Sequence, residues 1–244
     1  ATTPALSAEY ADYGIKAAYT GKGWDASLSL FRGMSKKPEL QEVAHQLGFP
    51  VTVQVNQVYR LVKALGFDTS FTSDKWVYRG EAAYVITENA DGTNPLITPT
   101  HFDYVVGAER PLGDDFRLQF QFIERVIPNF TSPAQVTGPD PVSQGVNQAL
   151  ASANALLNQY QDGITPSSTL RLAYTNEANH LEAEIFFMYN YIGSEYLFRP
   201  KVAYAATDFL KLSLGLEDYN GPASRPLGAM SVYDSVFFEA RYIF

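Results

Sequence analysis

The chain has no cysteine, so disulfides, thiolate metal sites and redox chemistry at sulfur are excluded. It also has no apolar run near the roughly 18 residues that a membrane-spanning helix requires, so any passage through a membrane must use strands. Histidine is scarce, and none of His45, His101 and His180 is followed by another histidine at metal-binding spacing. No serine is singled out as a partner for a histidine either. We therefore expect no metal, no cofactor and no enzymatic activity.

Positive charge is also limited. Lysine and arginine total 18 against 26 acidic residues, for a net charge of −8, and no basic run occurs. Nucleic-acid binding needs a basic footprint, so we exclude nucleic acid as a partner. Aromatic residues, in contrast, are abundant, with 16 Tyr and 16 Phe against 2 Trp. Such rings suit the boundaries of a lipid layer, although soluble β-sandwiches carry them too.

The strongest pattern is an alternation of apolar and polar residues. In the segment 209–217, four leucines point to one side, and Lys211, Ser213 and Glu217 point to the other. Segments of about ten residues with this period, bounded by Gly, Asp, Asn or Pro, are typical of transmembrane barrels. The segment 51–72 is strand-like, but Lys63 breaks its apolar side. We predict roughly eleven strands on this pattern, within 10–20, 24–32, 51–72, 76–87, 101–109, 116–125, 169–175, 180–191, 196–206, 209–217 and 232–244.

The connections between these segments alternate in length. Short turns are expected at 21–23, 73–75, 113–115, 176–179 and 207–208, and long loops at 33–50, 89–100, 129–168 and 218–231, with a tight turn at 193–194 as the exception. Outer-membrane barrels have short periplasmic turns and long external loops, which this chain obeys if its C-terminus is periplasmic. The first strand would then start outside, although bacterial barrels normally have even strand numbers. Either a strand within 41–72 is miscounted or the chain is the C-terminal part of a larger barrel.

The longest connection, 129–168, has a helical pattern over 142–160, with apolar residues at three- and four-residue spacing and no charge between Asp140 and Asp162. Two interpretations are open: an external helix that packs on the rim, or a constriction or plug folded into the lumen. A shorter helical candidate at 38–47 is interpreted as loop structure. No linker divides the chain, so we predict an all-β protein, with 1–244 forming a single transmembrane antiparallel β-barrel domain of about 12 strands or part of a larger one.

The final residues resemble the terminal strand of bacterial outer-membrane proteins. Phe238, Ala240, Tyr242 and Phe244 alternate and end on phenylalanine. The resemblance implies that Phe238, Tyr242 and Phe244 form the signal read by the barrel-assembly machinery, in the bacterial outer membrane and in contact with its lipid. The stretches 13–33, 79–81 and 105–110 are similar to an uncharacterised family of long proteobacterial outer-membrane barrels, whose members are longer than this chain. That second resemblance brings no activity with it.

Charged residues gather on the polar side of the predicted strands. Buried charges are costly unless they are paired, so this face implies either water or a dense salt-bridge network. Both signs are present, and the basic side chains on the later strands are expected to form a strip that faces Glu182 and Glu184. The predicted lumen-lining residues are Lys16, Arg79, Glu81, Asp103, Glu109, Arg117, Arg125, Arg171, Glu182, Glu184, Arg199, Lys201, Lys211, Glu217, Glu239 and Arg241.

Two functions from different classes fit these patterns. The first is a porin-like channel that passes small hydrophilic solutes or ions through a lumen of mixed charge. The second is a structural or scaffolding barrel with a filled lumen, whose long loops bind a partner protein. A homo-oligomer is compatible with either function. In a channel, neutralising Arg199 and Lys201 would shift ion preference, whereas in a filled scaffold it would destabilise the fold.

Overall fold

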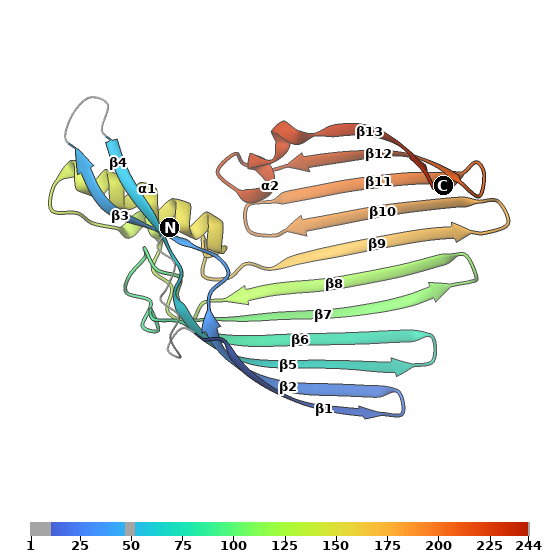
Figure 1. Ribbon diagram of the computed structural model, residues 1–244, viewed down its shortest axis with the longest axis horizontal. Coiled ribbons are helices and arrows are strands. Elements are labelled where there is room, and N and C mark those ends of the chain that lie inside the picture. The colour runs from blue at the N-terminus through green and yellow to red at the C-terminus, as the bar shows by residue number, and fades with distance from the viewer. Residues whose placement is uncertain (1–10, 47–51, 244) are drawn as a thin grey trace.

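Figure 1 shows a computed structural model that describes residues 11–46 and 52–243. Its main body is one antiparallel sheet of eleven strands in the order β1-β2-β5-β6-β7-β8-β9-β10-β11-β12-β13. The all-β, antiparallel class predicted from the sequence is confirmed. The strands are β1 (Tyr13–Gly21), β2 (Trp24–Met34), β5 (Leu61–Ser73), β6 (Trp76–Ile86), β7 (His101–Leu112), β8 (Phe116–Val126), β9 (Ser167–Asn176), β10 (Leu181–Asn190), β11 (Glu195–Ala205), β12 (Leu210–Asn220) and β13 (Ser235–Tyr242).

The two ends of the sheet differ in their connections. Five short turns lie at one end, to the right in Figure 1, and the long connections, with α1 and the short helix α2 (Pro226–Ala229), lie at the other. Gly23, Asp74 and Gly113 in the short turns have positive φ, which glycine and aspartate tolerate better than branched residues. We refer to these as the turn end and the loop end.

The alternating sequence gives the sheet two different faces. Neighbouring residues in a strand point to opposite sides, so pairs of neighbours compare the faces directly. Ser27 is 6% exposed and Leu28 52%, and Ser213 is 5% exposed and Leu214 56%. The polar face is therefore the more enclosed one, as expected for a sheet that curls toward its polar side and crowds the side chains there. No second layer covers the apolar face within the described residues.

A second, two-stranded sheet was not predicted. β3 (Glu39–Gln46) pairs with β4 (Thr52–Val58) as a hairpin inserted between β2 and β5. The interpretation of 38–47 as loop structure was wrong, because a bulge between Glu42 and Ala44 interrupts the period of two that marks a strand. Of the two extra strands, β4 lies within the region 41–72 and β3 begins two residues before it, and they leave the number of strands in the main sheet at eleven.

The helix predicted in the longest connection is confirmed as α1 (Pro141–Asn158). Asp140 caps it by accepting hydrogen bonds from the backbone N–H groups of Val142 and Ser143. The helix lies beyond the loop end, beside β3 and β4 (Figure 1). A small buried cluster joins Ala155 of the helix to Ile127 and Tyr160. None of the helices in the described residues is both long and apolar enough to cross a membrane.

The two edge strands, β1 and β13, each pair on one side only within the described residues. All pairs in the sheet are antiparallel, so alternate strands reverse direction and an odd number places both edges in the same direction. In Figure 1 both run from the loop end toward the turn end. The edges could therefore meet directly only as a parallel pair.

Candidate functional site: the polar face and its loop-end pocket

All sixteen predicted lumen-lining residues lie on one face of the sheet, which we call the polar face. Residues directly opposite each other in an antiparallel pair share a face, and the register links the strands without interruption. Lys201, for example, is opposite Glu184, and Asp103 is opposite Arg125. The period of two in the sequence was sufficient to place these residues on one face, because almost every strand keeps this period without interruption.

The C-terminal half of the polar face contains a chain of ion pairs across four strands. Arg171 on β9 approaches Glu184 on β10 at 2.5 Å between Nη2 and Oε2. The other carboxylate oxygen of Glu184 lies 4.0 Å from Arg199 on β11, and Arg199 lies 3.8 Å from Glu217 on β12. The arginine side chains keep more than a third of their exposure, so water screens these pairs.

Of the basic strip that the sequence places opposite Glu182 and Glu184, Arg171, Arg199 and Lys211 approach one of these carboxylates, whereas Lys201 pairs on the other side of its strand. Lys211 on β12 reaches Glu182 on β10 at 2.6 Å, and Lys201 on β11 reaches Glu239 on β13 at 3.6 Å. Acidic and basic side chains are thus interleaved from strand to strand. Which strand each long side chain reaches depends on its rotamer, and strand periodicity does not specify that. An interleaved face has little net field across it.

The N-terminal half of the polar face has fewer ion pairs and more open space. Lys16 pairs with Asp68 at 3.1 Å. Small residues at Ser29, Gly66 and Ala83 leave a hollow of about 460 Å³ beside them, which Glu81 also lines. A Cβ at position 66 would lie 2.6 Å from the Ser29 hydroxyl, so the Ser29 side chain occupies the space that a larger residue at position 66 would take. Toward the turn end, Glu109 lies between Arg79 at 2.8 Å and Arg117 at 3.4 Å.

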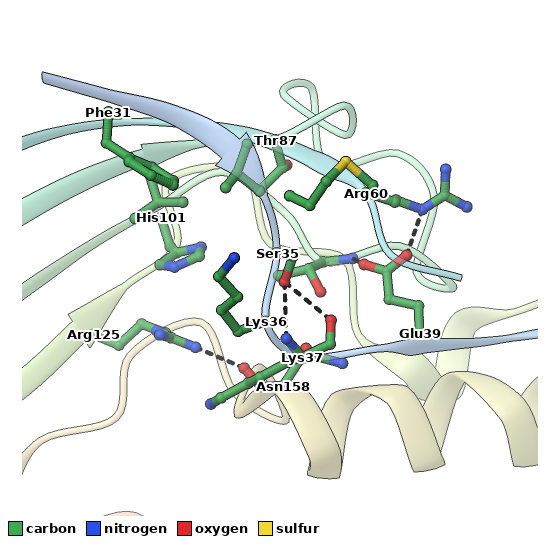
Figure 2. A pocket seen from close by; sticks show the side chains of 14 residues that line it. Phe31, Ser35, Lys36, Lys37, Glu39, Arg60, Thr87, His101, Arg125 and Asn158 are labelled. Atoms are coloured by element: carbon green, nitrogen blue, oxygen red, sulfur yellow. Dashed lines mark hydrogen bonds and ion pairs between the residues drawn. The ribbon is translucent and has the colours of Figure 1, made fainter. Parts of the chain in front are cut away.

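At the loop end the polar face is closed by loops around a cavity of about 240 Å³ (Figure 2). Arg125 on β8 donates to both carboxylate oxygens of Asp103 at 2.6 and 2.7 Å. Its Nη1 also donates to the Asn158 carbonyl at the C-terminus of α1, at 2.7 Å. A cation at this position satisfies the free carbonyls and the helix dipole. Arg125 therefore connects the sheet to the helix.

A second set of ion pairs connects the loops around the same pocket. Arg60 donates to Glu39 at 2.5 Å and to Glu88 at 2.7 Å, and Glu39 accepts from the Thr98 backbone N–H at 2.7 Å. Nearby, burial and the charge of Arg125 lower the pKa of the Lys37 ammonium. Sequence reasoning missed these residues because their connections have no period that marks a face. The one signal in the sequence for this site was the apolar–polar alternation of β4, which ends at Val58, two residues before Arg60.

The predicted assembly-signal residues belong to the last strand. Phe238 and Tyr242 lie on the apolar face of β13, and Phe238 is 68% exposed. Phe244 lies outside the described residues. No cluster of three or more potential metal ligands occurs in the described part of the chain.

Comparison with known proteins assigns no family, since no family model matches the chain. No curated protein matches it in sequence. Among solved structures, a KdgM porin in complex with disordered oligogalacturonate aligns with a TM-score of 0.34 at 6% identity, over 96% of this chain and 98% of that chain. A second KdgM porin structure gives a TM-score of 0.34 at 8% identity over the same shares. Similarity at this level assigns no function to the chain.

Proposed function

We propose that the chain forms the wall of a bacterial outer-membrane channel through which small hydrophilic solutes or ions diffuse. The observation that carries this proposal is the difference between the two faces. The enclosed face bears the ion pairs, and the exposed face bears leucine, isoleucine, valine and aromatic rings along all eleven strands. A transmembrane barrel with a wet lumen has the same arrangement.

The apolar face supports a lipid environment. Ile15, Phe67, Phe120 and Val202, on strands spread across the sheet, are each more than 40% exposed. Soluble monomers rarely expose apolar patches of more than a few hundred Å², and an apolar face on every strand exceeds this by far. Exposed rings also lie near the turn end, where Tyr19 and Trp24 are 5.3 Å apart. Aromatic girdles of this kind mark the boundary between lipid and water.

A channel requires the sheet to close. Because β1 and β13 run in the same direction, closure needs either a parallel contact between them or an odd number of further strands in between. We propose that the sheet closes around the polar face, with 1–244 as one barrel domain or part of a larger one. In this arrangement the connection 129–168 lies at the external mouth, and the barrel-assembly machinery reads β13.

The lumen would show little preference for charge. Nine of the sixteen polar-face residues are basic and seven are acidic, and the ion pairs interleave the signs. Rings of one charge create strong selectivity, and interleaved pairs do not. We therefore propose small hydrophilic solutes of either charge as the cargo.

The test is single-channel conductance of the detergent-refolded chain in a planar bilayer, with heat-modifiable gel mobility as the measure of folding. Reproducible conductance steps from folded protein are expected. Folded protein that gives no steps would contradict the channel. It would favour the second candidate, a scaffold with a filled lumen, which the density of ion pairs between β9 and β13 supports.

A further inference from the structure

One arginine on the apolar face has no polar partner. Arg110 on β7 is directly opposite Leu118 on β8, which shares its face with Phe120. Within the described part of the chain, the half-buried Arg110 side chain makes no hydrogen bond and no ion pair. Its Nε is buried, whereas the two terminal Nη nitrogens remain accessible. The Nη nitrogens are therefore the part of the guanidinium that a ligand can reach.

The carboxylates near Arg110 in the chain do not pair with it. Glu109 points to the polar face, where it lies between two other arginines at 2.8 and 3.4 Å. Asp114 in the turn after β7 and Asp74 in the turn before β6 make no ion pair with Arg110 in the part of the chain that the structure describes. A partly desolvated cation without a partner is costly. An anion from outside the chain would remove that cost.

The indole of Trp76 holds the guanidinium in place. Val77 on β6 is opposite Glu109, and Trp76 and Arg110 are the next residues of the two strands toward the turn end. The guanidinium carbon of Arg110 lies 5.3 Å from the centroid of the Trp76 ring, within the range of a cation–π interaction. Because the planar fork of an arginine on a ring is already oriented, less entropy is lost when it binds an anion.

This pair lies where the apolar face ends, at the turn end of the sheet. Arg110 is two residues from the end of β7, or about 7 Å along the strand. Other rings lie at the same end: the Trp76 ring is 6.0 Å from that of Tyr78, and Phe116 on β8 is 4.8 Å from Tyr174 on β9. Aromatic girdles mark the boundary between lipid and water, which is also the depth of lipid headgroups.

We propose that Arg110, held by Trp76, binds the phosphate group of a phospholipid in the periplasmic leaflet. This site rests on the proposed function, because it requires the apolar face to lie in lipid with the turn end in the periplasm. Hydrogen bonds from an arginine fork to phosphate are charge-assisted and among the strongest in proteins. Val106 and Phe120, the neighbours toward the middle of the sheet, are 49% and 45% exposed, and acyl chains would cover them. A free anion would leave them uncovered.

Native mass spectrometry of the folded protein in detergent tests the site. The protein is titrated with phosphatidylglycerol, and Arg110→Gln is compared with Lys22→Gln, which removes one positive charge from the turn between β1 and β2. We expect Arg110→Gln to weaken binding of the first phosphatidylglycerol by about tenfold, the loss for one charge-assisted contact. The control should bind as the unaltered protein does. Equal binding by Arg110→Gln and the control would overturn the site.

A second variant and a second lipid test the two parts of the recognition. Trp76→Leu keeps the charge but removes the ring, and it should weaken phosphatidylglycerol binding by about threefold, the loss of one cation–π contact. Unchanged binding would overturn the role of Trp76. Diacylglycerol with the same acyl chains has no phosphate, so it should bind Arg110→Gln and the unaltered protein equally. A loss of diacylglycerol binding in Arg110→Gln would overturn phosphate as the recognised group.

A competition arm identifies the source of the phosphate. Inorganic phosphate at the concentration of the lipid should not displace phosphatidylglycerol, and displacement would reduce the site to one for a free anion. The readout does not depend on conductance. A conducting protein whose Arg110→Gln variant binds lipid unchanged rejects only this site. A folded protein that binds lipid through Arg110 without conducting rejects only the channel.

Discussion

At the scale of single residues, Arg199 and Lys201 separate the two proposed functions. They are two residues apart on β11, and each lies near a carboxylate on a neighbouring strand, Glu217 and Glu239 respectively. Replacing both with glutamine should shift ion preference toward cations by a few-fold, because the carboxylates stay. Both basic side chains are more than a third exposed, so the loss of stability should stay below about 1 kcal/mol per pair.

The measurement is the reversal potential in a salt gradient, alongside urea unfolding. Lys22→Gln with Lys75→Gln, two lysines in the short turns, provides the matched loss of charge away from the polar face. A filled scaffold gives the opposite result, in which the β11 variant unfolds in far less urea and carries no current.

The residue scale also shows what periodicity could predict. It assigned a face to Lys16, Glu184 and Arg241 because one residue's place in a strand determines its side. It could not pair Lys211 with Glu182, because Ala203 on the intervening β11 strand lies between them and the contact depends on the length and rotamer of the lysine. It could not find Glu39 either, whose partners Arg60 and Thr98 come from two different connections.

At the scale of elements, Asn154 holds the assembly of α1, the β3–β4 hairpin and the 89–100 loop. Its side chain is fully buried, accepts from the Leu40 backbone N–H at 2.6 Å and donates to the carbonyls of Leu40 and Leu96 at 2.9 Å. The amide of Asn154 thus pairs with the N–H and the carbonyl of Leu40 in β3, as the backbone of a neighbouring strand would.

Replacing Asn154 with alanine should destabilise this loop assembly by on the order of 2–4 kcal/mol, because buried backbone groups lose their partners. Hydrogen exchange should accelerate in β3 and β4 and stay unchanged in β8 and β9. The control is Asn147→Ala on the same helix, which removes one exposed hydrogen bond of 3.3 Å from the Asn147 side chain to the Thr137 carbonyl. Faster exchange in β8 and β9 as well would mean that the main sheet depends on its loops.

The elements themselves were largely predictable. The period of two identified the strands of the main sheet, and the absence of charge between Asp140 and Asp162 with its helical spacing identified α1. The hairpin was missed because the bulge at Glu42 breaks the period. The packing site of α1 could not be predicted either, because in the sequence the buried Asn154 cannot be distinguished from a polar residue on the exposed side of a helix.

At the scale of the whole molecule, the difference between the two faces predicts how strongly a lysine on each face destabilises the protein in a lipid bilayer. Phe120 lies at the middle of β8 on the apolar face, and Gln121 follows it on the polar face. Phe120→Lys should lower the free energy of unfolding from lipid by about 2–4 kcal/mol, as lysine costs near the midplane of a bilayer. Gln121→Lys should change it by less than about 0.5 kcal/mol, because a polar, wet face accepts the charge.

Urea unfolding from lipid vesicles, followed by tryptophan fluorescence, measures both variants. Equal effects of the two lysines would mean that the faces do not differ in solvent, and the membrane assignment would then be wrong. A larger effect of Gln121→Lys would indicate a packed, dry polar face and a filled lumen.

The order of strands in the main sheet has a further consequence, for how the molecule folds. Within residues 11–46 and 52–243, each strand of the main sheet pairs with the strands next to it along the chain, apart from the inserted β3–β4 hairpin. The contact order between strands is therefore low, and the sheet can grow by one hairpin at a time without distant segments having to find each other. In the proposed closed barrel, the joining of β1 to β13 would connect the strands of the sheet that lie farthest apart in the chain, and its entropy cost grows slowly with length. Closure should be the last step, so an unclosed sheet with its polar face formed is the expected folding intermediate.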